Sequence, residues 1–243
     1  MELRGLVFQL VFAASLAVRR IISPIARLPI LGSVYRFGKR RANRVLERLA
    51  GIDTSRDVGY EGLEFGEEKG SIYMAASWSA LPSVLSRREV SASDVFLDVG
   101  SGKGRLLYQA AVLYPFQRVI GVDLSEELNR VARANIDRNR RRLRCQDVQV
   151  VTADAVRYVI PGDVTVVCMN NPFGGELFET FMDGVVDSLH RNPRRLTLLY
   201  GNPIMHDSAL RHGFSMVKRS GHSGEFEFRR YDWEPEPAVS GAS

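Results

Sequence analysis

Short apolar runs alternate with stretches of helical periodicity between residues 95 and 231. The apolar runs predict consecutive strands, and apolar residues at helical spacing predict helices between them. The predicted strands are Val95–Leu97, Val119–Asp123, Val150–Thr152, Val164–Met169 and Leu196–Tyr200, with a terminal antiparallel hairpin of Phe214–Arg219 and Glu225–Tyr231. The predicted helices are 106–113, one beginning after Ser125, 177–189 and 205–212. This alternation favours an α/β domain.

A glycine-rich segment, Asp98-Val99-Gly100-Ser101-Gly102-Lys103-Gly104, joins the first strand to its helix. Glycines at this junction allow a sharp turn and a close approach of backbone N–H groups to a ligand. A dinucleotide fingerprint requires a third glycine where Arg105 stands. Asp98 would repel a pyrophosphate but suits a ligand with an ammonium and a sulfonium group. We interpret Lys103 and Arg105 as solvated or structural residues rather than site residues.

At these residues the chain resembles the class I S-adenosylmethionine (SAM) dependent methyltransferases, whose first motif has this acid-plus-glycine form. The resemblance implies a Rossmann-like seven-stranded α/β sheet, with six parallel strands and a terminal antiparallel hairpin strand. It also implies that SAM is the cofactor, with Asp123 on the ribose and Asp154 near the adenine amine. The implied cofactor-binding residues are Asp98, Gly100, Ser101, Gly102, Gly104, Asp123, Asp154 and Asn170.

Each of these residues also has a purely structural interpretation. The glycines could serve a tight turn alone, and Asp123 could cap the helix that starts near Ser125. Asp154 could form the turn after its strand, because acidic residues are common there. A nicotinamide-dependent reductase is a further alternative, which Arg105 disfavours.

The loop Asn170-Asn171-Pro172-Phe173-Gly174 follows the fourth strand. It resembles the Asn/Asp-Pro-Pro-aromatic loop of amino-group methyltransferases, but it has one proline where that family has two. It is also similar to the Asn-Asn-…-Phe-Gly loop of the non-SET histone-lysine methyltransferases, which share an upstream motif found here as Phe65-Gly66-Glu67. Both likenesses imply that Asn170 and Phe173 act on a nitrogen acceptor. A strand-ending turn with a packing phenylalanine is the alternative.

We therefore expect a SAM-dependent methyltransferase with a nitrogen acceptor, such as a protein lysine or another protein amine. The alternatives are a small-molecule O- or N-methyltransferase and a non-catalytic methyltransferase-like binding protein. Nucleic acid is a less expected partner, because no RNA- or DNA-binding module is recognisable. The basic run Arg138, Arg140, Arg141, Arg142 and Arg144 is interpreted as a solvated helix end, with a nucleic-acid or acidic-partner patch as the alternative.

Positive charge is concentrated near the start of the chain. Residues 1–48 contain ten Lys and Arg against two Glu, a balance of +8 within a net charge of +5, which leaves −3 for the remainder. The apolar run from Leu6 to Val18 is shorter than the roughly 20 residues that span a bilayer. We interpret it as an interfacial or packing helix. Residues 1–22 are thus candidates for peripheral contact with an anionic membrane, and packing on the domain or on a second copy stays open.

The expected organisation has four parts: a hydrophobic and basic helical extension (1–50), lid or substrate-side helices (51–92), a SAM-binding domain (93–233) and a disordered tail (234–243). A helix is predicted over 71–85, and Tyr60, Phe65, Tyr73 and Trp78 are candidates for the lid or for the core. Cys145 and Cys168 cannot build a disulfide framework and indicate a reducing compartment. The expected location is cytoplasmic, at the inner membrane surface if the extension binds lipid. The four histidines lack metal-ligand spacing, so no metal is expected.

Overall fold

The computed structural model describes residues 10–14, 17, 41–54, 75–220 and 227–235. These residues form a seven-stranded sheet in the order β3-β2-β1-β4-β5-β7-β6. Neighbours from β3 to β5 pair in parallel, and β7 is antiparallel to both β5 and β6. The strands are β1 (Val95–Val99), β2 (Arg118–Asp123), β3 (Asp147–Thr152), β4 (Val164–Met169), β5 (Leu196–Gly201), β6 (Ser215–Ser220) and β7 (Phe228–Trp233). The predicted seven-stranded Rossmann-like sheet is confirmed.

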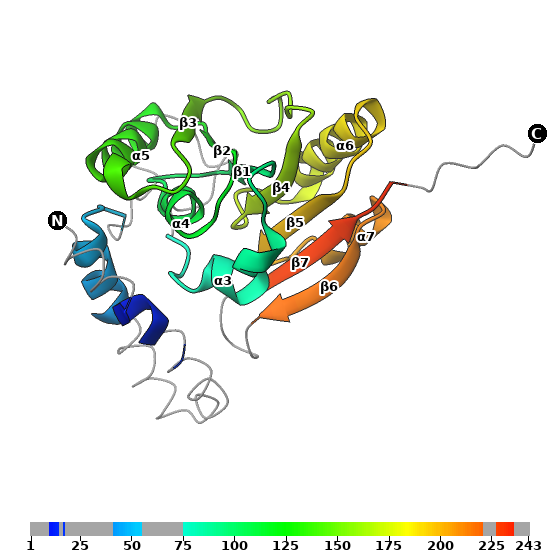
Figure 1. The fold of residues 1–243 in the computed structure, drawn as a ribbon. Coiled ribbons are helices and arrows are strands. Elements are labelled where there is room, and N and C mark those ends of the chain that lie inside the picture. The colour runs from blue at the N-terminus through cyan, green and yellow to red at the C-terminus, as the bar shows by residue number, and fades with distance from the viewer. Residues whose placement is uncertain (1–9, 15–16, 18–40, 55–74, 221–226, 236–243) are drawn as a thin grey trace, which may run out of the picture.

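Helices cover both faces of this sheet (Figure 1). One apolar cluster joins Phe96 and Val119 to residues of α3 (Ala80–Val84), α4 (Arg105–Leu113) and α5 (Glu126–Asn139). A second cluster joins Val95 and Leu97 to residues of α6 (Gly175–Arg191) and α7 (His206–Arg211). Successive β1 side chains thus enter opposite layers, as a strand buried on both faces requires. Two short 3-10 helices are η4 (Arg87–Glu89) and η5 (Arg140–Arg142).

The sheet order reverses between β1 and β4, so the loops after these two strands lie beside each other at the carboxyl edge. Ligands of open α/β sheets bind at such a switch point. The glycine-rich segment leaves β1 there, and the Asn170 loop leaves β4. The fold therefore brings the predicted donor and acceptor loops together.

The predicted helix over 71–85 is wrong for the part that the structure describes. Residues 75–79 are not helical, and the helix is limited to Ala80–Val84. The carbonyl oxygens of Ala76 and Ser77 accept hydrogen bonds from the side chains of Arg105 and Gln109 of α4, and Ser77 O also accepts from Ala80 N at 3.0 Å in a single turn. Tertiary contacts to α4 thus hold a segment in which the apolar spacing had suggested a continuous helix.

Residues 41–50, within the segment expected to be a basic helical extension, are helical. Phe12 and Leu46 are both buried and belong to the same apolar cluster as Trp78, which is a core residue. Packing on the domain therefore accounts for Phe12, whereas most of the proposed membrane-contact segment 1–22 lies outside the described residues. No helix in the described ranges is long and apolar enough to cross a membrane. Tyr60, Phe65, Tyr73 and residues 236–243 also lie outside the described part of the chain.

Candidate active site

Three glycines shape the loop between β1 and α4. Gly100, Gly102 and Gly104 have φ angles of 70°, 53° and 78°, a region that other L-residues adopt at a cost. The Gly100 and Ser101 N–H groups both donate to Val122 O, at 2.9 and 3.1 Å, which fastens the loop to the end of β2. A Cβ at Gly100 would lie 2.6 Å from Pro172 Cβ. The glycine thus serves the turn and the contact with the loop after β4.

Asp98 is a carboxyl group buried beneath this loop, with 2% of its surface exposed. Its Oδ2 and the Ser101 Oγ have no hydrogen-bond partner among the described residues. Burial, and then the nearby charge of Asp123, raise the pKa of Asp98 to about 8, while a backbone hydrogen bond from Leu107 acts against them. A buried polar atom without a partner is costly unless a ligand supplies one. The carboxyl therefore fits a cationic group such as the ammonium of SAM.

Asp123 ends β2 and is already bound to backbone. Its Oδ2 accepts from Gly102 N at 2.8 Å and its Oδ1 from Ser125 N at 2.9 Å. The capping alternative is wrong in detail, because Ser125 is the N-cap of α5 and accepts from Leu128 N. Burial raises the pKa of Asp123 despite these two N–H donors. Asp123 holds the glycine loop in place, and its proposed ribose contact stays a prediction.

Asp154 lies after β3, next to Asp123 at the same sheet edge. Ala153 N donates to Asp123 O at 3.1 Å, which joins the two strand ends. Asp154 Oδ1 accepts from Val156 N at 3.0 Å, and Arg157 lies 4.0 Å from its other oxygen. The turn-forming role is therefore present in the structure. A role toward an adenine amine stays a prediction.

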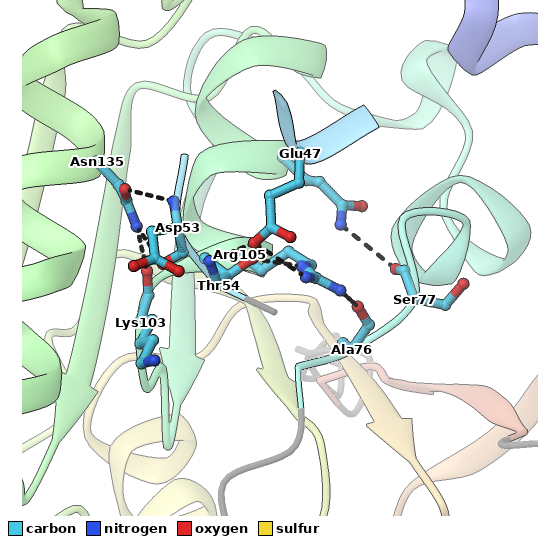
Figure 2. Close-up of polar contacts among 9 residues, drawn as sticks. Glu47, Asp53, Thr54, Ala76, Ser77, Lys103, Arg105 and Asn135 are labelled. Carbon is cyan, nitrogen blue, oxygen red and sulfur yellow. Dashed lines mark hydrogen bonds and ion pairs between the residues drawn. The ribbon is translucent and has the colours of Figure 1, made fainter. Parts of the chain in front are cut away.

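Arg105 replaces the third glycine and fastens the preceding chain to the cofactor loop (Figure 2). Its Nε donates to Thr54 Oγ1 at 2.7 Å, its Nη1 to Ala76 O at 2.9 Å, and its Nη2 lies 3.4 Å from Glu47 Oε1. The guanidinium also stands 5.6 Å from the centre of the Trp78 ring. Arg105 and Lys103 are 4% and 6% exposed, so the solvated interpretation is wrong for both. The structural interpretation is confirmed for Arg105.

Asn135 of α5 provides a second connection to the same segment (Figure 2). Its Nδ2 donates to Asp53 O at 3.1 Å and to Lys103 O at 3.0 Å, and its Oδ1 accepts from Asp53 N at 2.9 Å. The side chain thus joins residues 52–54 to the glycine loop. Sequence reasoning missed Glu47, Thr54 and Asn135, because no local pattern links positions 47 to 135.

The loop after β4 places Asn170 and Phe173 differently. A Cβ on Gly201 would lie 2.5 Å from Asn170 Oδ1, so the glycine at the end of β5 makes room for this amide. Phe173 is partly buried and packs edge-on against Phe181, with ring centroids 5.7 Å apart. The Asn170 amide therefore lies beside the end of β5, while Pro172 of the same loop meets the cofactor loop at Gly100. Phe173 has the packing contact that its alternative interpretation described.

Asn171 explains why this loop has one proline. Its φ angle is 53°, in the left-handed region, whereas proline is fixed near −65°. A second proline would be incompatible with this backbone, and asparagine is among the residues that tolerate it best. Asparagine in place of the first proline therefore goes with a different backbone conformation of this loop.

Comparisons with known proteins agree with this architecture. Residues 96–191 match the model of a methyltransferase domain. A stretch of 78 residues is 31% identical to an rRNA N(6)-adenosine-methyltransferase of Caenorhabditis elegans and covers 32% of this chain. The chain spans only 36% of the length of that curated relative.

Solved structures share the fold at low sequence identity. A ribosomal protein L11 methylase of Lactobacillus delbrueckii subsp. bulgaricus has a TM-score of 0.51 at 15% identity, over 75% of this chain and 84% of its own. A protein of Pyrococcus horikoshii proposed to be an RNA methyltransferase also has a TM-score of 0.51 at 15% identity, over 82% of this chain and 98% of its own. Residues 96–191 of this chain are thus similar to a methyltransferase domain, and the chain shares the fold of these solved methyltransferases.

Proposed function

We propose that this protein transfers a methyl group from SAM to an exocyclic adenine nitrogen in RNA. The observation that carries the proposal is the contact of the two loops, Gly100 against Pro172, which sets Asn170 beside the predicted cofactor site. The matched stretch of an rRNA adenosine methyltransferase supports adenine as the acceptor over other amines. The earlier expectation of a protein amine becomes the second candidate, supported by the fold shared with a ribosomal protein methylase.

SAM supplies an electrophilic methyl group on a sulfonium, and the protein contributes alignment and the exclusion of water. The Asp98 carboxylate would bind the ammonium group, and Ser101 Oγ would bind a neighbouring polar atom. Asp123 would keep its two backbone bonds, which hold the glycine loop, while its remaining lone pairs face a ribose.

Asn170 would orient the acceptor. Its Oδ1 can accept a hydrogen bond from the amino group, which turns the nitrogen lone pair toward the methyl group. No side chain has to remove a proton before transfer, because an amino nitrogen can lose it after the new bond has formed. Phe173 packs on Phe181 and in this role bounds the acceptor side rather than reacting.

The test is methyl transfer from labelled SAM to unmethylated rRNA transcripts and, in parallel, to ribosomal proteins. Nucleoside mass spectrometry should find N6-methyladenosine in the RNA. Asn170→Ala should lower the rate of product formation by about 10- to 100-fold while calorimetric SAM binding is retained, and Asn170→Asp, which keeps an acceptor oxygen, should lose less of the rate. Label that enters protein alone would overturn the RNA proposal in favour of the second candidate.

A further inference from the structure

Two arginine-rich segments that are far apart in the sequence adjoin in the fold. One is helix 41–50, which ends beside α5 in Figure 1, and the other is the end of α5 with η5. Arg138 Nη1 donates to Gly51 O at 3.0 Å, and Arg142 Nη1 donates to Leu49 O at 3.3 Å. These two arginines bind the carbonyl oxygens at the end of helix 41–50. The interpretation as a merely solvated helix end is therefore wrong for Arg138 and Arg142.

The joined segments form what we call the arginine surface, defined as the arginines of residues 41–48 and 138–144. The arginines of helix 41–50 lie at positions 41, 44 and 48, opposite its buried Leu46 and Glu47. Two acidic residues, Asp137 and Asp147, lie along the second segment. Arg44, Arg48, Arg141 and Arg144 are exposed, and none of the ion pairs among the described residues includes them. Their charge is available to a partner.

The chemistry of this surface favours phosphate over other anions. Arginines make up 29 of the 33 basic residues of the chain, and all eight basic residues of the surface are arginine. The planar guanidinium binds phosphate oxygens in pairs and stacks on bases, which the ammonium of lysine does not do. Val45, 43% exposed, is the one large apolar side chain recorded as exposed on helix 41–50. The surface therefore has little to insert into a lipid layer.

The surface also lies close to the predicted active site. Gly51 accepts from Arg138, and Thr54, three residues later, accepts from Arg105 at the end of the cofactor loop. Three residues span at most about 11 Å. A strand of RNA bound to the surface would therefore pass near the cofactor loop, with Asn135 and Arg105 holding the intervening residues in place.

We propose that the arginine surface binds the phosphate backbone of the acceptor RNA. This inference rests on the proposed function, since it assigns the RNA a place to dock. The backbone contact would be independent of sequence, and base recognition would fall to the loops at the sheet edge. The surface would act on the affinity for RNA and leave the chemical step unchanged.

The test measures binding of an RNA hairpin of about 40 nucleotides by fluorescence anisotropy over a range of salt concentrations. Two double variants remove charge from the two segments: Arg44→Gln with Arg48→Gln, and Arg141→Gln with Arg144→Gln. Arg87→Gln with Arg88→Gln is the matched control, since both are exposed on η4, which lies against β7 through the Glu89–Arg230 ion pair. Each surface pair should weaken binding about tenfold and reduce the salt slope by about 1.4, and the control should change neither.

Methylation assays separate this proposal from the proposed function. The surface variants should raise KM for RNA several-fold with kcat and the melting temperature unchanged. Binding that is insensitive to both pairs would overturn the surface, even if N6-methyladenosine still forms. If the surface variants lost binding to phosphatidylglycerol vesicles but kept RNA binding, the proposal of an RNA-binding surface would be overturned in favour of a membrane-binding one. RNA binding that depends on the surface would uphold it even if the methylated product were not adenine.

Discussion

The loops after β1 and β4 touch at Gly100 and Pro172, yet they are held in different ways. The β1 loop uses glycine at each of its left-handed positions, and Arg105, Asn135 and Asp123 fasten it from three sides. The β4 loop places the non-glycine Asn171 in the left-handed region. Its Phe173 packs on one ring of α6. The donor side is thus braced by buried polar contacts, and the acceptor side by packing and a close fit to Gly201.

The difference follows from what each side has to bind. An invariant cofactor binds more tightly to a rigid loop whose polar atoms are already in position, because ordering those atoms during binding costs free energy. Acceptors differ between members of one fold, and the loop that meets them varies accordingly. We therefore expect substitutions on the two sides to have separable effects on stability, SAM affinity and turnover.

Removal of the Arg105 guanidinium should have the largest effect. Arg105→Met leaves the buried Glu47 carboxylate without its cation, which should cost about 3–5 kcal/mol of unfolding free energy. Chemical denaturation measures this loss. The double variant with Glu47→Gln should recover part of the stability, because it removes the unpaired charge. Equal unfolding free energies of the single variant and the wild type would show that the Arg105–Glu47 contact does not stabilise the protein.

Asp98→Asn should weaken SAM binding at pH 8 by about 1.5–3 kcal/mol, roughly 10- to 150-fold, because a hydrogen bond to a charged group is lost. Calorimetry of the apoprotein with SAM measures the change. The Asp98 pKa of about 8 also predicts that wild-type SAM binding releases a proton below pH 8 and strengthens as the pH rises toward 8. Asp98→Asn should lack this pH dependence of SAM binding. A SAM affinity that is the same in the wild type and in Asp98→Asn would contradict the assignment of Asp98 to the ammonium group.

The same pKa sets a pH dependence of stability without SAM. The folded-state pKa of about 8 exceeds the ordinary value of 3.8 for an exposed aspartate, so the stabilising contribution of Asp98 is full below pH 3.8 and is lost as the pH rises through 8. The melting temperature of the wild type should therefore fall between pH 3.8 and pH 8 more steeply than the melting temperature of Asp98→Asn. Parallel profiles would indicate that the carboxyl is not buried as described.

On the acceptor side, Asn170→Ala should lower kcat by about 10- to 100-fold, or about 1.4–2.7 kcal/mol, with SAM affinity unchanged. Single-turnover rates at saturating SAM measure the effect. The separation of kcat from SAM affinity is the feature that distinguishes this loop from the Asp98 side. A matching loss of SAM binding would mean that Asn170 belongs to the cofactor site alone.

The smallest effect is expected at Asn171. Asn171→Ala should cost about 1 kcal/mol, because alanine tolerates a left-handed φ poorly, and Asn171→Gly should not. Asn202→Ala is the matched comparison, since Asn202 has a φ of 48° after β5. Melting temperatures would measure both. Of these substitutions, only those at Asn171 should also alter turnover, because Asn171 adjoins Asn170.

The local pattern was sufficient for the core of the domain. Val95–Leu97 and Leu106–Leu113 showed the change from strand to helix, and the glycines between them showed the turn, because backbone conformation there depends on adjacent residues. Ser125 was visible as a helix start for the same reason. Residues 75–79 were mistaken for helix, since their carbonyls bind α4, which no local pattern reveals.

The sequence by itself determined the alternation of strands and helices, the order of the motifs and the acid-plus-glycine loop, because each depends on short-range periodicity and on residue type; the parallel sheet followed only from the family resemblance. Only the tertiary structure decided that Arg105 is a buried brace, that Asn171 is left-handed, and that residues 41–50 join residues 138–144 in one surface. The Arg105 contacts and the arginine surface depend on contacts across 29 to 93 positions, and such contacts form only when the sheet has brought the segments together.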